Sequence, residues 1–454
     1  MVVLSLVVLA VSAEAGDRSN VQGIGMARTY VAGSRGLDAV GINPANLGLP
    51  EGSGVQFSFL PLGVHVGSNF LRYDLYETYF TGTESKNGRV PKYLSDVDKR
   101  DLLAAFADDL GRISGGVEAR LFGLVYQREG FGGLAVTITE QASFYGAVPR
   151  DYASFLFYGN TPGSQYDFQD AYARASWLRE YAFSFGVHVT DKSPIGPLAV
   201  GGALKILHGR GFFEIEHFNT ALRTSDNGTL TGSVDFLAHS AGMDFSDGES
   251  VQQAMLFPSP AGSGLGFDLG VSSRPTDYLT VGISLTDIGS MQWSQNAEQA
   301  RAETTIVVDD PLDEQRRQAI EDAVRGEKGP TEPFEVSLPT TLRLGIMIAV
   351  EKLVDVGILS NGLAVCIDYN QGLHSEGITE PARVSMGLEY SLLRWFPLRA
   401  GVSLGGIDHF NTALGCGLHL GSFELDLASD NLGWLFSPST FSGGSLSAGM
   451  RLRL

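Results

Sequence analysis

The chain has 454 residues, enough for one large barrel or for two to three soluble domains. Charged residues make up only 18% of it, below the share usual in soluble domains, and glycine is abundant with 57 residues. The net charge of −19 argues against a nucleic-acid-binding protein and against electrostatic docking on an anionic lipid surface. Beyond the N-terminus no apolar run reaches about 18 residues, so we expect no transmembrane helix.

The first residues are typical of a secretory signal peptide. Residues 2–11 are apolar, and Ala13-Glu14-Ala15 supplies a small-x-small cleavage site. We expect residues 1–15 to be removed, and the missing basic residues suggest a true start upstream. A buried N-terminal strand is the alternative.

Residues 16–52 form a segment that is too polar and glycine-rich for a strand in lipid. It ends in Asn43-Pro44-Ala45-Asn46-Leu47. An asparagine before proline is extended, and Pro44 is preset for one helical turn. This composition predicts a compact plug ahead of a barrel at residues 53–454.

From Val55 onward, apolar and polar residues alternate in many segments, which indicates β-strands with one apolar and one polar face. The first such strand is expected near Val55–Asn69, and the last at Leu446–Leu454. Several runs last about nine to eleven residues, the length that crosses a bilayer when tilted. A soluble β-sandwich would show the same alternation with the opposite sense, and strand length favours the barrel. The polar face carries Ser184, His188, Lys205, Arg343, Glu351, Asp368, Glu389, Arg399, Glu424 and Asp426.

The connections between these strands alternate in length. Long excursions are expected at 70–119, 142–179, 209–262 and 288–338, with short turns between them. Short periplasmic turns and long outer loops are the rule in bacterial outer-membrane barrels. We therefore predict an all-β, transmembrane antiparallel β-barrel of about fourteen strands, with both termini on the periplasmic side. Two loop segments are predicted to be helical, Val97–Ile113 and Leu312–Arg325, and we interpret both as loop-capping helices.

The two cysteines, Cys366 and Cys416, fall on opposite faces of their predicted strands, with Cys366 toward the lumen. A disulfide needs facing Cβ atoms, so we predict none.

The plug and several later segments resemble the FadL-type outer-membrane fatty-acid-transporter superfamily and its PorV- and PorQ-like relatives. Residues of the plug match the pattern of that superfamily, namely Gly25, Ala27, Gly36, Asp38, Ala39, Asn43, Pro44, Ala45 and Leu47. Weaker similarity appears at residues 266–271, 279–293 and 337–346. The resemblance implies a hatch inside a fourteen-stranded barrel, with structural or gating roles for Gly36, Asp38, Asn43, Pro44, Ala45 and Asn46.

Catalytic motifs are weak. Residues 401–405 fit the G-x-S-x-G pattern of serine hydrolases, but that pattern needs a strand-turn-helix elbow, and here it lies in an alternating strand. No histidine pair has metal-ligand spacing. We predict no enzyme activity, no cofactor and no metal.

Three functional hypotheses remain. The resemblance implies passage of hydrophobic, fatty-acid-like molecules through a plugged lumen. A PorV- or PorQ-like scaffold for protein secretion or surface attachment is the alternative, with secretion-system proteins as partners. A purely structural protein of the bacterial outer membrane is the third. The predicted inner face is rich in glycine and shows few apolar side chains, which leaves transport and scaffold both open.

Overall fold

The computed structural model describes residues 20–50, 52–85, 88–106, 109–242, 260–308, 326–353, 362–374, 381–406, 409–432 and 441–454. Within these ranges no helix is long and apolar enough to cross a membrane. The expected signal peptide at 1–15 and the expected helix at 312–325 lie outside the described residues.

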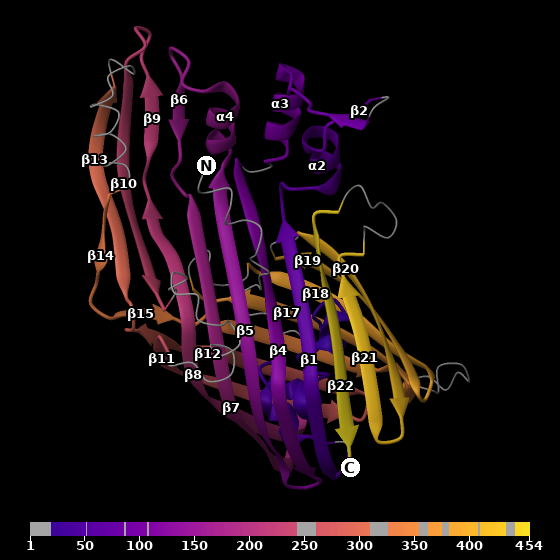
Figure 1. Cartoon of the computed structure of the whole chain (residues 1–454). Helices are drawn as coiled ribbons and strands as arrows, with labels where there is room; N and C mark the ends of the chain where they lie inside the picture. The colour runs from indigo at the N-terminus through magenta and orange to yellow at the C-terminus, as the bar shows by residue number, and fades with distance from the viewer. Residues whose placement is uncertain are drawn as a thin grey trace.

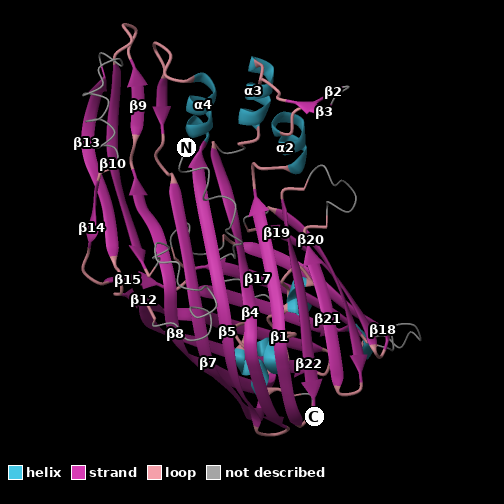
Figure 2. Cartoon of the chain, viewed as in Figure 1, coloured by secondary structure: helices cyan, strands magenta, loops and turns pink. Residues whose placement is uncertain are grey.

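Fourteen antiparallel strands close into a barrel, as Figures 1 and 2 show. Around the wall they are β1 (Gly54–Ser68), β4 (Leu110–Arg128), β5 (Gly132–Pro149), β7 (Tyr172–Ser193), β8 (Gly196–Phe218), β11 (Gly262–Thr276), β12 (Leu279–Trp293), β16 (Thr341–Ala349), β17 (Leu363–Gly372), β18 (Arg383–Leu393), β19 (Phe396–Gly405), β20 (Phe410–Leu420), β21 (Phe423–Asp430) and β22 (Gly443–Arg453). The ring closes at β1, where Val64 lies opposite Val117 of β4 and Leu446 of β22. The predicted barrel of about fourteen strands is confirmed.

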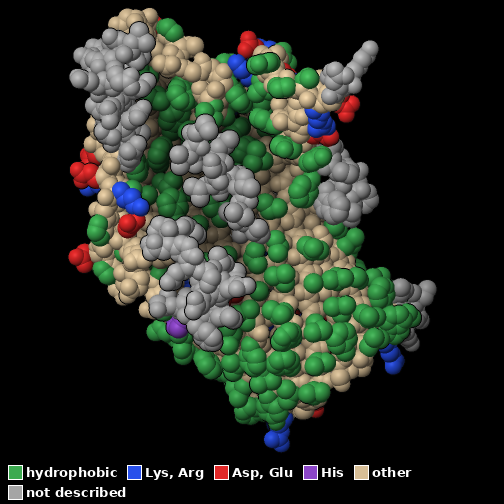
Figure 3. Space-filling view, in the orientation of Figure 1, with side chains coloured by type: hydrophobic (Ala, Val, Ile, Leu, Met, Phe, Trp, Pro, Cys, Tyr) green, Lys and Arg blue, Asp and Glu red, His purple; other side chains and the backbone are tan. Residues whose placement is uncertain are grey.

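The sense of the alternation is that of a membrane barrel. Along β11, Leu265, Phe267 and Leu269 are each about half exposed on the outside. The intervening Asp268 and the later Ser272 are fully buried on the inside. Apolar side chains outward and polar side chains inward are what a barrel in lipid requires. Figure 3 shows the hydrophobic side chains gathered over the lower part of the wall.

β1 is interrupted at Leu60-Pro61. The pairing with β22 shifts register between Phe59 and Leu62, and Leu60 has a φ of +48°. Proline has no N–H for the ladder, so a bulge is the expected local structure.

The wall is much taller on one side (Figure 1). β7 and β8 have 22 and 23 residues, whereas β17 and β21 have 10 and 8. Shorter strands extend the tall side: β6 (Gln165–Asp167), β9 (Ala221–Thr224), β10 (Leu230–Ala241), β13 (Glu298–Val308), β14 (Glu327–Pro330) and β15 (Phe334–Ser337). β10 pairs with β8 and β13, and β15 pairs with β12.

The prediction that 209–262 and 288–338 are loops throughout is therefore wrong in part. Much of both segments is strand. These strands stand beyond the apolar belt, and the covered face of β13 begins with the small side chains of Ala300 and Ala302, so its alternation is weak. A search for lipid-facing alternation misses such strands.

Short helices stand over the same end of the barrel, which we call the outer end: α2 (Tyr73–Phe80), α3 (Asp96–Ala104) and α4 (Arg150–Tyr158). A hairpin of β2 (Thr83–Ser85) and β3 (Gly88–Val90) lies beside them, and a 3-10 turn, η4 (Val350–Lys352), lies in a connection between two barrel strands. The predicted helix at 97–113 exists but ends at Ala104, because Leu110–Ile113 joins the ladder between β4 and β5. Ser95 caps α3 and forms a capping box with Asp98.

Candidate functional site

Residues 20–49 fill the inside of the barrel, and we call them the plug. All of them are buried except Arg28, Tyr30 and Arg35, which are half-buried. The plug contains α1 (Val21–Ile24) and two 3-10 turns, η2 (Gly36–Ala39) and η3 (Pro44–Gly48). α1 packs on β20, β21 and β22, while η3 packs on β7, β8 and β11 on the other side. The plug thus reaches across the lumen.

The Asn-Pro-Ala turn is held from both sides. Within the plug, the Asn43 side chain accepts a hydrogen bond from the Ala45 N–H at 3.2 Å, so that Asn43 caps η3 with Pro44 in its first turn. Asn43 Nδ2 also donates to Ser272 Oγ of β11 at 3.0 Å, and Ser272 donates to Asn46. Asn46 Nδ2 donates to Ser34 Oγ at 2.7 Å. All four predicted residues of this turn are fully buried.

Glycines of the wall make room for this turn. A Cβ placed on Gly201 of β8 would lie 2.4 Å from the carbonyl carbon of Pro44, and one on Gly186 of β7 would lie 2.5 Å from the Pro44 oxygen. A Cβ on Gly401 would similarly collide with Met26. The wall and the plug backbone therefore touch directly, which only glycine permits.

Three charged contacts fasten the plug to the second half of the barrel. Arg451 Nη1 of β22 donates to Asp38 Oδ2 at 2.7 Å. Arg28 Nη2 donates to Asp430 Oδ2 of β21 at 3.2 Å. Asp368 of β17 accepts from the backbone N–H groups of Tyr30 and Val31 at 2.6 and 2.8 Å. The sequence indicated that Asp368 faces inward, whereas nothing in it paired Arg28 with Asp430.

Gly36 and Asp38 lie together at the start of η2. Gly36 has a φ of +56°, a conformation that favours glycine, and a Cβ there would lie 2.1 Å from Gln56 Oε1. The predicted plug residues therefore form two groups, Gly36 with Asp38 and the Asn43–Asn46 turn, at separate contacts with the wall.

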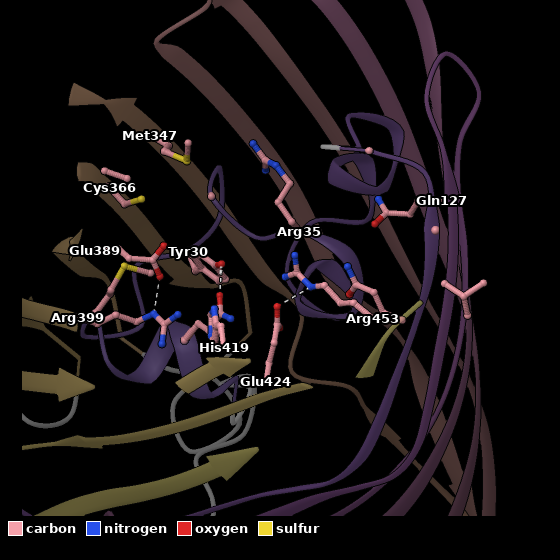
Figure 4. A pocket seen from close by; sticks show the side chains of 18 of the residues that line it. Tyr30, Arg35, Gln127, Met347, Cys366, Glu389, Arg399, His419, Glu424 and Arg453 are labelled. Atoms are coloured by element: carbon pink, nitrogen blue, oxygen red, sulfur yellow. Dashed lines mark hydrogen bonds and ion pairs between the residues drawn. The ribbon is translucent and has the colours of Figure 1, made fainter. Parts of the chain in front are cut away.

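Below the plug, at the end of the barrel that carries Leu454, lies a cavity of about 370 Å³. Figure 4 shows its lining, and we call it the vestibule. Tyr30 and Arg35 of the plug face Glu389, Arg399 and His419 of the wall, with Glu424 and Arg453 nearby. Arg399 pairs with Glu389, and Arg453 pairs with Glu424 at 2.8 Å. The vestibule is therefore polar.

His419, Glu424 and Asp426 bring their donor atoms within 4.8 Å of one another. Arginines already occupy both carboxylates. Arg399 Nη1 lies 2.7 Å from Asp426 Oδ1, and Arg453 binds Glu424. A metal ion would have to displace guanidinium groups to bind here, so the geometry does not favour a metal centre.

Above the plug, toward the outer end, the inner face of the barrel is apolar. Buried residues at the outer parts of β8, β12 and β15 form what we call the outer apolar cluster: Leu207, Phe212, Met291, Trp293, Val336 and Leu338. The ring centroids of Phe212 and Trp293 lie 5.0 Å apart, and Phe334 packs at the edge. The indole N–H of Trp293 is buried and has no hydrogen-bond partner among the described residues. These inward apolar side chains were not predicted, because most of them lie in segments interpreted as loops.

A buried ion cluster lies between this apolar cluster and the plug. Lys205 of β8 is fully buried and its Nζ lies 2.6 Å from Asp268 Oδ1 and 2.7 Å from Asp287 Oδ1. Glu180 of β7 is 3.8 Å away. The inward positions of β8 are thus, in order, Gly201 against the plug, Lys205 in the ion cluster and Leu207 in the apolar cluster.

Comparison with known families now places the chain. The model of a family of unknown function, DUF5723, matches residues 54–430. The chain belongs to this family. Among curated proteins, none matches the sequence.

Solved structures of FadL-family channels are similar over nearly the whole chain. The toluene transporter TbuX of Ralstonia pickettii has 14% identity and a TM-score of 0.45, covering 96% of this chain and 99% of its own. The toluene transporter TodX of Pseudomonas putida has 12% identity and a TM-score of 0.45, covering 98% and 99%. A FadL homologue of Pseudomonas aeruginosa has 12% identity and a TM-score of 0.49, covering 97% and 99%.

The remaining sequence predictions concern the cysteines and the hydrolase pattern. Cys366 and Cys416 are both free, as predicted. Cys366 is buried and lines the vestibule. Ser403, the serine of the G-x-S-x-G pattern, is buried within β19, near its end, and the next described element is the strand β20.

Proposed function

We propose that this outer-membrane β-barrel lets hydrophobic small molecules pass through its lumen under the control of the plug. The observation that carries the proposal is the outer apolar cluster, which presents Phe212, Trp293 and neighbouring aliphatic side chains on the inner face above the plug. A lumen for water-soluble solutes would be polar throughout. These side chains are buried against one another, so an apolar molecule would contact them by displacing part of this packing.

The plug would then act as the gate. It fills the lumen between the outer apolar cluster and the polar vestibule, and its contacts with the wall are hydrogen bonds and ion pairs of individual residues. The wall hydrogen bonds run between strands and do not involve the plug, so the barrel can persist when the plug moves. On this proposal the outer end faces the exterior, and the turns near Leu454 face the periplasm.

The alternative is a scaffold that holds secretion or surface partners. The observation in its favour is the exposed aromatic surface of the segment from α2 to α3 at the outer end, which we call the outer cap. Tyr76 and Phe80 of α2 are more than half exposed, and Tyr93 is 94% exposed. Exposed aromatic side chains on loops commonly mediate recognition.

Uptake of radiolabelled oleate into vesicles that contain the purified protein separates the two. The variants are a deletion of residues 23–49 and Phe334→Asp at the edge of the outer apolar cluster, with Tyr93→Asp in the cap as the matched control. A channel predicts altered uptake for the deletion, reduced uptake for F334D and unchanged uptake for Y93D. Unchanged uptake in both F334D and the deletion, together with loss of a co-purifying partner when the 70–109 insert is shortened, would replace the channel by the scaffold.

A further inference from the structure

The turn between β4 and β5 presents two opposite charges at the end of the barrel that carries Leu454. Arg128 and Glu129 are both exposed, and within the described part of the chain neither side chain forms an ion pair or a hydrogen bond. A type II turn holds them in place, because the Phe131 N–H donates to the Arg128 carbonyl at 3.1 Å and Gly130 has a φ of +72°. Phe131 itself is about half exposed. A cation, a carboxylate and an apolar ring therefore stand side by side in one hydrogen-bonded turn.

The turn between β7 and β8 lies beside the first turn. The His188 N–H of β7 donates to the Phe131 carbonyl at 3.2 Å, which joins the two turns. This second turn also carries charges of both signs and an apolar side chain, Ile195, which is about half exposed. His188 lies 3.0 Å from Asp191, so that carboxylate is occupied, whereas Lys192 is exposed and has no side-chain partner among the described residues. The two turns together offer two cations and one carboxylate to a ligand.

Both turns lie at the edge of the apolar belt. Leu124 and Tyr126 of β4 are exposed on the outer face, and Arg128 continues the same row, since side chains on one face recur every second residue. Two residues of a strand span about 7 Å, and less than that in height because the strands are tilted. The headgroup layer of each leaflet is about 5–7 Å thick. Arg128 and Phe131 therefore lie at headgroup level, and Figure 3 shows Lys and Arg side chains at the lower tips of the wall beside hydrophobic ones.

We propose that the turn between β4 and β5 binds the headgroup of a phospholipid that carries a phosphate and a primary ammonium, as phosphatidylethanolamine does. Arg128 donates to the phosphate, Glu129 accepts from the ammonium, and Phe131 lies against the first carbons of the acyl chains. Lys192 supplies a second cation at the same level. The charge pattern selects the headgroup, because phosphatidylglycerol has no cation for Glu129 and the trimethylammonium of phosphatidylcholine has no N–H to donate. The occupant is a lipid because the lipid-facing wall runs without interruption into this turn, and the site does not depend on passage through the lumen.

The test is lipid retention by the full-length protein in mild detergent, measured by native mass spectrometry. The probes are phosphatidylethanolamine, phosphatidylcholine and phosphatidylglycerol with identical acyl chains. We expect the unmodified protein to retain phosphatidylethanolamine about fivefold better than either of the others, as one charge contact at the membrane surface provides. Glu129→Gln should abolish this preference, and Arg128→Gln should weaken retention of all three lipids about fivefold.

Two variants at the other end of the barrel serve as matched controls. Glu84→Gln and Arg223→Gln remove the same charges at exposed positions of the outer end and should leave retention unchanged. Equal retention of the three lipids by the unmodified protein would overturn the proposal, as would a preference that survives in E129Q. Stronger retention of phosphatidylglycerol would indicate a surface for anions alone and would also overturn it. The same holds if the folded protein retains none of the lipids, which would leave the two turns to a protein partner.

Discussion

Arg451 and Asp38 are 413 residues apart in the chain and form a two-pronged ion pair inside the barrel. Nη1 lies 2.7 Å from Oδ2 and Nη2 lies 3.2 Å from Oδ1. Arg451 also lies 3.4 Å from Glu424 and 3.7 Å from Asp426. One buried guanidinium therefore neutralises carboxylates of the plug and of β21 together.

Because Arg451 is shared in this way, substitutions of Arg451 and of Asp38 are expected to lower the free energy of unfolding by unequal amounts. Arg451→Gln removes the guanidinium that pairs with the buried Asp38, while Arg453 and Arg399 still pair with Glu424 and Asp426, and we expect a loss of about 3–5 kcal/mol in the free energy of unfolding. Asp38→Asn leaves Arg451 paired with the β21 carboxylates and should cost only about 1–2 kcal/mol. Urea unfolding in lipid vesicles measures both. A larger loss in D38N than in R451Q would contradict the shared-charge interpretation.

The contact of β8 with the plug predicts that alanine costs much more stability at Gly201 than at the adjacent Gly202. A Cβ on Gly201 would meet the backbone of Pro44 and Ala45 at about 2.5 Å, and backbone yields little. We expect Gly201→Ala to cost about 1–3 kcal/mol by overpacking. Gly202 lies on the outer face, where the nearest atoms, from the Phe185 ring, are 3.3 Å away. Gly202→Ala is the matched control and should change stability by less than about 0.5 kcal/mol. Equal losses would mean that the plug does not press on β8.

The barrel wall could be predicted from the sequence because its rule is local. Alternation with period two places Lys205, Asp368 and Arg399 inward whatever their partners are, and all three are buried inside. The partners themselves depend on closure of the ring. Arg451 meets Asp38 only because β22 closes on β1 around the plug, and a sequence pattern contains no such distance.

The outer half of the tall wall could not be predicted for a different reason. β10 and β13 extend the wall beyond the lipid-facing belt, and their covered faces carry mostly small apolar side chains such as Val234, Ala238 and Ala302, so the lipid criterion does not apply. Trp293 and Phe212, which carry the proposed function, lie where β8 and β12 enter this region. The end of α3 was missed because Leu110 and Ile113 fit a helical stripe as well as a strand.

The burial of Asn43 predicts slow cysteine labelling of the plug in the folded protein. Its side chain is fully buried against β11, so Asn43→Cys, in a background with both natural cysteines replaced by serine, should resist a bulky maleimide. Ser53→Cys is the control, because Ser53 is exposed beside the vestibule and should react at least about a hundredfold faster. Similar rates at both positions would mean that the plug leaves the lumen readily without a ligand.

The substitution of phenylalanine for tryptophan is expected to cost unequal amounts of stability at Trp293 and at Trp177. Trp293 stacks on Phe212, but its indole N–H has no hydrogen-bond partner in the described part of the chain, so Trp293→Phe removes ring volume and no hydrogen bond. We expect a loss of less than about 1.5 kcal/mol in the free energy of unfolding. Trp177→Phe also removes a 2.7 Å hydrogen bond to the Glu140 carboxylate. We expect its loss in the free energy of unfolding to exceed that of W293F by about 1.5–3 kcal/mol.

Urea unfolding in lipid vesicles compares the two variants, and Trp293→Ala completes the series. Its loss should reach about 3–5 kcal/mol, because a buried ring is replaced by a cavity. If W293F proved as costly as W177F, the Trp293 N–H would have to be bonded in the folded protein. A W293F variant that folds normally but loses uptake of oleate would instead assign that N–H to the passing molecule.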